Sequence, residues 1–222
     1  MMITPTDASI NFGLGTTSVV FPTAALPASP YFIVTTFDKY FYPGGMYFDM
    51  EMTKYSIRQA TVSDAAIIAR HRVGMFRDMG QVPTDALATK LLETSTAALG
   101  VLLRERSYIG WLAIAESDRV LAGAGANVQS QLPRISHSGI AVTTAPVPLV
   151  VNVYTEPDFR GMGIARAPMN TLLKWATEHG YDRVVLHASD AGRPLYQSLG
   201  FVPTNEMRWS PIDNGVTRLK PD

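Results

Sequence analysis

The strand-like stretch Leu149–Thr155 (LVVNVYT) leads directly into the loop Glu156–Ala165 (EPDFRGMGIA), and a helical pattern follows. The near-continuous apolar run is typical of a strand that is buried on both faces. Gly161 and Gly163 let the backbone turn tightly at the start of the helix and leave their N–H groups unobstructed. Because free amides and the helix dipole both attract negative charge, the junction predicts an anion site. Arg160 at its mouth favours a ligand that carries phosphate.

Three kinds of phosphate-binding loop compete for this junction. The chain contains no Gly-x-x-x-x-Gly-Lys-Ser/Thr string, which excludes a P-loop. A dinucleotide-binding loop needs a small residue five positions after Gly161, where Arg166 stands. Its glycines also follow the strand directly, whereas Glu156 to Arg160 intervene here, so a nucleotide-binding oxidoreductase is disfavoured. The third kind is the pyrophosphate loop of an acyl-CoA-dependent transferase.

Alternating and helical apolar patterns predict the other elements, working outward from this junction. In chain order they are a strand at Tyr55–Gln59, helices near 61–80 and 83–106, a hairpin of Tyr108–Glu116 and Val120–Gln129, a helix at Gly163–His179, a strand at Arg183–Ala188, a helix at Pro194–Leu199 and a strand at Phe201–Trp209. A polar, proline-bearing connection through Pro148 links the hairpin to Leu149–Thr155. This order predicts an α/β domain with a mixed, mostly antiparallel central sheet flanked by helices.

The composition excludes several classes of function. The 222 residues are 46% hydrophobic and 17% charged, which indicates a globular chain. There is no cysteine, so disulfides, thiolate metal sites and a cysteine nucleophile are excluded. The 19 basic and 19 acidic side chains balance, which argues against a general nucleic-acid binder. No apolar run in the first fifty residues predicts a membrane span.

The first fifty residues differ from the rest of the chain. They hold ten of the 21 aromatic residues but only four charged side chains, and Tyr31–Phe37 is their best strand candidate. We therefore predict an aromatic-rich extension over residues 1–53, followed by one domain over residues 54–222. Three interpretations of the extension stay open: an arm packed on the domain or on a second subunit, a flexible segment, or an artefact of a start codon assigned too early.

Two short motifs resemble those of a known family. Arg160–Ala165 (RGMGIA) resembles the Arg/Gln-x-x-Gly-x-Gly/Ala motif of the GNAT (Gcn5-related N-acetyltransferase) superfamily. Downstream, Leu186–Ser189 (LHAS) and Leu195–Phe201 (LYQSLGF) resemble its second signature, a strand followed by a short helix that ends in Leu-Gly-Phe. The two motifs lie in the family's order, and the resemblance covers residues 54–209. It implies the GNAT fold, in which the strand Leu149–Thr155 splays from the next strand.

The resemblance implies acetyl-CoA as the acyl-donor substrate and no metal. We expect the loop amides to hold the pyrophosphate and main-chain atoms at the end of the strand to pair with the pantetheine arm. One of those amides is expected to face the thioester carbonyl, and Ser189 to touch the pantetheine arm. Pro168 departs from the family pattern and is expected to remove one hydrogen bond in the second turn of the helix. The predicted donor-binding residues are Tyr154, Thr155, Arg160, Gly161, Met162, Gly163, Ile164, Ala165 and Ser189.

Tyr196 and Glu156 are the predicted catalytic residues. The family often uses a tyrosine on the short helix to protonate the departing thiolate. A thiol pKa of about 8.5 and a phenol pKa of about 10 make that transfer nearly matched. Leu149–Thr155 holds no glutamate that could serve as the general base. Glu156, just beyond the strand, is the candidate base, and water that relays the amine proton is the alternative.

These residues predict an N-acetyltransferase that moves an acetyl group from CoA to a primary amine of a small molecule or peptide. The transfer is expected to be direct, within a ternary complex. The alternative is a non-catalytic acyl-CoA-binding regulatory domain, which the absence of a glutamate from Leu149–Thr155 favours. We expect a cytoplasmic protein without nucleic-acid or membrane partners. The resemblance leaves a homodimer open, because family members are often dimers.

Overall fold

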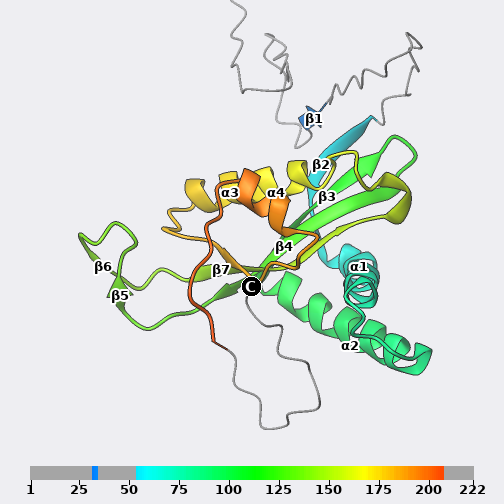
Figure 1. Cartoon of the computed structure of the whole chain (residues 1–222), viewed down its shortest axis with the longest axis horizontal. Helices are drawn as coiled ribbons and strands as arrows, with labels where there is room; N and C mark the ends of the chain where they lie inside the picture. The colour runs from blue at the N-terminus through cyan, green and yellow to red at the C-terminus, as the bar shows by residue number, and fades with distance from the viewer. Residues whose placement is uncertain (1–31, 35–53, 208–222) are drawn as a thin grey trace, which may run out of the picture. The chain divides into compact units, whose positions relative to one another are not determined.

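The computed structural model of the chain describes residues 32–34 and 54–207 (Figure 1). The chain divides into two compact units, residues 1–187 and residues 188–222. The first unit contains a six-stranded sheet with its helices, and the second contains the short helix α4 (Arg193–Ser198).

A mixed, mostly antiparallel sheet forms the centre of the first unit. Its described strands lie in the order β1-β2-β3-β4-β7-β8, and among them only β7 and β8 run parallel to each other. The predicted sheet is therefore confirmed. The strands are β1 (Phe32–Val34), β2 (Tyr55–Gln59), β3 (Tyr108–Ala115), β4 (Val120–Gln129), β7 (Val147–Thr155) and β8 (Val185–Leu186).

Helices cover both faces of this sheet (Figure 1). Trp111 and Leu112 are neighbours on β3, so their side chains point to opposite faces. The ring of Trp111 packs on Trp175 of α3 with 5.6 Å between centroids, whereas Leu112 lies in the buried core with Ile68 of α1. Helix α3 therefore covers one face, and α1 with α2 covers the other. The helices are α1 (Ala65–Asp78), α2 (Asp85–Arg104) and α3 (Arg166–Glu178).

Asp64 determines where α1 begins. It closes the short 3₁₀ turn η1 (Val62–Asp64), which leads into the helix. Its carboxylate accepts the N–H of Thr61 at 2.7 Å and two hydrogen bonds from the guanidinium of Arg58 at 2.8 and 2.7 Å. Burial alone would raise the pKa of Asp64, but these hydrogen bonds lower it, so the carboxylate stays charged at the start of the helix.

Gly125 on β4 is required by a close approach of an aromatic ring. Tyr108 on β3 extends across the neighbouring strand, and a Cβ added at Gly125 would overlap the Tyr108 hydroxyl. A glycine inside a strand is typical of a bulge or of a close approach by another group. At Gly125 the close approach is that of the Tyr108 side chain, and a register irregularity lies directly after it.

Helix α2 has the length and apolar composition that would let a helix cross a membrane. It packs along α1 and buries Ala88, Ser95 and Leu99, which a helix of a globular core also does. Length and composition are therefore weak evidence for a span here.

Three predicted elements differ from the structure. The strand predicted at residues 183–188 is reduced to Val185–Leu186, because β8 leaves β7 after the pair Val150–Leu186 and its later backbone groups have no neighbouring strand. Residues 201–207 form no strand, and the last two residues of that prediction lie outside the described residues. The connection through Pro148 contains a small hairpin of β5 (Arg134–Ile135) and β6 (Val142–Thr143), and β7 already begins at Val147.

Part of the N-terminal extension joins the sheet. β1 lies inside the predicted strand 31–37 and pairs antiparallel with β2 at the sheet edge. The three interpretations of residues 1–53 otherwise fall outside the described residues, and the domain boundary at residue 54 stays a prediction.

Candidate active site

β7 and β8 separate and leave an open strand edge. Their parallel pairing consists of Leu149 with Val185 and Val150 with Leu186. On the other side of β7, Val150 pairs with Ala126 and Asn152 with Gly125, so Val151 is an extra residue in a β-bulge. Among the described residues, no strand pairs with the β8 side of β7 at residues 151–155, although the carbonyls of Val151 and Thr155 accept from the side chains of Arg72 at 3.2 Å and Arg160 at 3.1 Å. An extended ligand could add there as a strand does.

The loop between β7 and α3 presents unpaired backbone amides. A 3₁₀ turn, η2 (Pro157–Phe159), follows β7, and the amide of Arg160 donates to the Pro157 carbonyl at 3.3 Å. Gly161 and Gly163 have φ of +77° and +72°, a conformation that glycine adopts without strain. Within the described part of the chain, the amides of residues 161–165 have no acceptor. Five amides in a row thus precede α3, where the helix dipole adds positive potential.

Pro168 does not interrupt α3. The helix begins at Arg166, later than the predicted start at Gly163, so Pro168 is its third residue. The first N–H groups of a helix have no intrahelical acceptor, so the missing N–H removes no helix hydrogen bond. The expected loss of a bond in the second turn was therefore wrong, because the glycines extend the loop by three residues.

Arg160 is held by contacts on three sides. Its Nη2 donates to Asp78 Oδ2 at 2.6 Å and its Nε to the Thr155 carbonyl at 3.1 Å. Its guanidinium also stacks on the ring of Tyr154, 5.2 Å from the centroid. The side chain predicted to attract phosphate is thus engaged with α1 and with the end of β7.

Glu156 points into the space between β7 and α1. Its carboxylate accepts hydrogen bonds from Arg70 Nη2 at 2.7 Å and from His71 Nε2 at 3.0 Å. Since an ionised carboxylate only accepts, Nε2 carries the imidazole proton. Burial lowers the pKa of His71, although the charge of Glu156 opposes the shift, so the ring is neutral at pH 7. The candidate base is therefore buried and paired with α1.

Sequence reasoning missed the role of His71. Asn152, Tyr154 and Glu156 alternate along β7 and its end, so they share the face toward α1. His71, Gly74 and Asp78 are spaced three and four residues apart and share one face of α1. These two periodicities were present in the sequence, but nothing in it said that the two faces meet.

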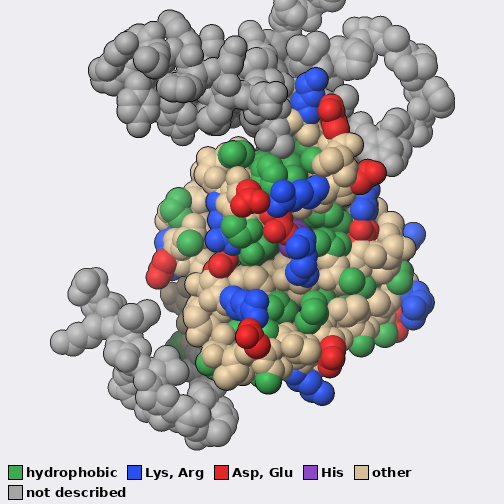
Figure 2. All heavy atoms as spheres, turned by 90° about the vertical axis from the view of Figure 1, so that its right-hand side faces the viewer, with side chains coloured by type: hydrophobic (Ala, Val, Ile, Leu, Met, Phe, Trp, Pro, Cys, Tyr) green, Lys and Arg blue, Asp and Glu red, His purple; other side chains and the backbone are tan. Residues whose placement is uncertain are grey.

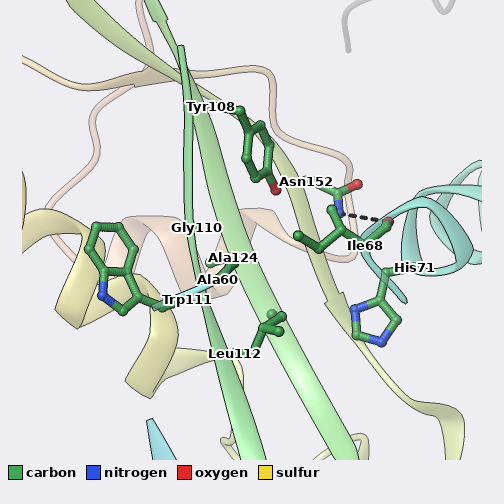
Figure 3. Close-up of a pocket in the computed structure, with 10 residues that line it drawn as sticks. Ala60, Ile68, His71, Tyr108, Gly110, Trp111, Leu112, Ala124 and Asn152 are labelled. Atoms are coloured by element: carbon green, nitrogen blue, oxygen red, sulfur yellow. Dashed lines mark hydrogen bonds between the residues drawn. The ribbon is translucent and has the colours of Figure 1, made fainter. Parts of the chain in front are cut away.

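A narrow gap between α1 and the sheet lies beside these residues (Figure 3). Asn152 Nδ2 donates to the Ile68 carbonyl at 3.4 Å, while its Oδ1 is buried without a partner among the described residues. Burial raises the pKa of Tyr108, whose hydroxyl lies near Asn152 in Figure 3. The gap is too narrow for a water molecule, so it does not receive substrate.

The second unit contains the other two predicted site residues. Ser189 Oγ accepts the N–H of Gly192 at 3.2 Å at the entry to α4. Tyr196 is half-buried on α4, with its ring edge-on to Phe201 at 6.0 Å between centroids. Burial raises the pKa of Tyr196, so its phenol stays protonated at neutral pH, as an acid must.

Charged side chains of both signs are interspersed on the face shown in Figure 2. Exposed ion pairs among the described residues include Arg77 with Asp85 and Arg119 with Asp158. Over the described ranges, no group of three or more acidic or histidine side chains could hold a metal ion.

Comparisons with known proteins agree with this geometry. Residues 78–201 match the family model for the "Acetyltransferase (GNAT) family". A GCN5-related N-acetyltransferase from Ralstonia eutropha is 32% identical, with a TM-score of 0.62 over 71% of this chain and 98% of the other. A predicted acetyltransferase from Clostridium acetobutylicum, solved with acetyl-CoA, is 26% identical, with a TM-score of 0.59 over 70% and 95% of the two chains. Human N-acetyltransferase 8B is 44% identical over 52 residues, a match that spans only 22% of this chain and 23% of the relative. The chain therefore belongs to the GNAT acetyltransferase family.

Proposed function

We propose that this protein is an acetyl-CoA-dependent N-acetyltransferase that acetylates a primary amine. The observation that carries the proposal is the row of unpaired amides at residues 161–165, which opens α3 beside the free edge of β7. Five amides at a helix N-terminus suit a pyrophosphate, and a free strand edge suits the amide-bearing pantetheine arm. The Clostridium relative, which was solved with acetyl-CoA, supports the same donor.

In this proposal, the loop binds the pyrophosphate of the donor and the strand edge binds its pantetheine arm. The amides of Gly161, Met162, Gly163, Ile164 and Ala165 bind the pyrophosphate. Main-chain atoms at the free edge of β7, beginning with Thr155, pair with pantetheine, Arg160 supports the loop, and Ser189 contributes a hydroxyl to the pantetheine arm. An amide on the free edge of β7 faces the thioester oxygen and stabilises the charge that develops there.

The proposed chemistry is direct transfer. The amine nitrogen forms a bond to the thioester carbon, the carbon–sulfur bond breaks, and the thiolate leaves with the electron pair. Tyr196 donates its phenolic proton to that thiolate, and water carries the proton of the amine away. Because burial raises the pKa of Tyr196, this proton transfer is less evenly matched than that of an exposed phenol. Holding both reactants together supplies much of the rate.

A thiol-release assay with acetyl-CoA and a panel of primary amines tests the proposal. We expect turnover with at least one amine, and a large loss of kcat in Tyr196→Phe with the KM for acetyl-CoA little changed. Binding of acetyl-CoA without turnover on any amine would favour the non-catalytic acyl-CoA-binding domain. Thermal stabilisation by NAD but not by CoA would overturn both.

A further inference from the structure

Three side chains between α1 and the phosphate-binding loop form a contact group that we call the stack. The ring of Tyr154 is tilted by 37° to the ring of His71, with 5.0 Å between centroids, and the guanidinium of Arg160 lies 5.2 Å from the Tyr154 centroid. A carboxylate binds each end of the stack, because Glu156 accepts from His71 and Asp78 accepts from Arg160. These contacts connect His71 and Asp78 of α1 to Tyr154 at the end of β7 and to Arg160 in the loop that follows.

Gly74 allows the stack to form. It lies on the same face of α1 as His71 and Asp78. A Cβ at Gly74 would stand 2.5 Å from the Tyr154 hydroxyl and 2.6 to 2.8 Å from two of its ring carbons. The ring therefore lies directly on the helix backbone, where no side chain separates them. The position of Tyr154, and with it that of Arg160, is set by α1.

Arg160 is the residue immediately before the five unpaired amides. Gly161 and Gly163 adopt left-handed conformations and have no neighbour within 4 Å at their Cβ positions, so packing does not hold them. Amides that must converge on one anion lose affinity if the loop first has to be ordered. A fixed anchor at Arg160 reduces that cost.

We propose that Asp78 is a positioning residue for the acyl donor: through Arg160 it holds residues 161–165 in the conformation that binds the pyrophosphate. This inference rests on the proposed function, since it assumes that the loop binds the phosphates of acetyl-CoA. Asp78 touches neither donor nor acceptor in this proposal. It acts through its 2.6 Å contact with the guanidinium.

Electrostatics alone predicts the opposite effect of removing Asp78 on the affinity for acetyl-CoA. The side chains of Asp78 and Arg160 are 49% and 44% exposed, so both act on the surroundings of the loop. Removing the carboxylate would remove a negative charge and release a positive one, which by charge alone strengthens phosphate binding. Positioning predicts weaker binding. The sign of the change therefore decides between the two effects.

The experiment uses the full chain and compares two acyl donors. The acceptor is an amine that the wild type acetylates. Steady-state kinetics are measured with acetyl-CoA and with S-acetylpantetheine, which lacks the pyrophosphate, as the donor. The proteins compared are the wild type, Asp78→Ala and Asp78→Glu. Asp85→Ala is the matched control, because it removes a carboxylate from the exposed pair with Arg77 at 2.7 Å and does not touch the loop.

We expect Asp78→Ala to raise the KM for acetyl-CoA by about three- to tenfold with kcat within about twofold, as the loss of a preordered contact predicts. Its KM for S-acetylpantetheine should not change. Asp78→Glu should recover part of the loss, and Asp85→Ala should match the wild type.

The inference is overturned if Asp78→Ala binds acetyl-CoA as tightly as the wild type or more tightly. It is equally overturned if both donors lose affinity alike, since that is the behaviour of a general loss of structure. A wild-type chain that binds acetyl-CoA while Asp78→Ala is unaffected leaves the proposed function intact. A wild-type chain that shows no affinity for acetyl-CoA overturns the proposed function, and this inference with it.

Discussion

Replacement of Glu156 by alanine separates a structural role from a catalytic one. The carboxylate is 11% exposed and is the acceptor for His71 Nε2. In Glu156→Ala the buried N–H of His71, whose side chain is 1% exposed, has no acceptor, which costs about 1–3 kcal/mol. Arg70 is 59% exposed, so losing its ion pair adds only about 0–1 kcal/mol.

We therefore expect the free energy of unfolding to fall by about 2–3 kcal/mol in Glu156→Ala. Glu156→Gln keeps a side-chain oxygen that can accept from His71, so its loss should be about 1 kcal/mol. Urea unfolding followed by circular dichroism at pH 7 measures both values. An alanine variant that unfolds within about 0.5 kcal/mol of the wild type would refute the argument from burial.

The same variants report on catalysis. A general base contributes about 10²–10⁴-fold to the rate, so Glu156→Gln would lose that factor in kcat if the carboxylate took the amine proton. We expect kcat to change by only a few fold, because the carboxylate faces Arg70 and His71. A hundredfold loss in a glutamine variant of near-native stability would restore Glu156 as the base.

Three further perturbations follow from the geometry. Gly163→Ala forces an alanine to φ of +72° or moves the loop. The KM for acetyl-CoA should therefore rise by about five- to thirtyfold, which corresponds to about 1–2 kcal/mol. Gly180→Ala is the control: at φ of +73° beyond the end of α3, it should change stability without changing this KM. Gly125→Ala overlaps the Tyr108 hydroxyl and should lower the free energy of unfolding by about 1–3 kcal/mol in chemical denaturation, whereas Gly100→Ala, which has open space in α2, should not destabilise the protein. Hydrogen bonds from Arg134 and from the amide of His137 lower the pKa of Asp182 from 3.8. The charged form of Asp182 therefore stabilises the fold at neutral pH, and that contribution is lost as the pH falls below about 4. Compared with the wild type, Asp182→Asn should have a lower free energy of unfolding at pH 7 and lose less of it on acidification.

Local patterns in the sequence were sufficient for most of the fold and for the loop. The apolar runs of β3 and β4 on either side of a tight turn and the near-continuous apolar run of β7 predicted these strands to within two residues. Gly161 and Gly163 indicated the turn by residue type alone, because glycine adopts their positive φ values without strain. Strand pairing at β8 was not predictable, because it depends on how far a neighbouring strand continues beside it.

The sequence by itself determined the element order, the family motifs and the amide-lined loop, because these depend on residues that are close together in the chain. Only the tertiary structure decided what the charged residues of the site do. Glu156 meets His71 across 85 residues, and Arg160 meets Asp78 across 82. Periodicity shows which side chains share a face of a helix or a strand, but the partner of that face is chosen by packing over the whole core. For this reason a candidate base and a candidate phosphate ligand both proved to be bound to α1.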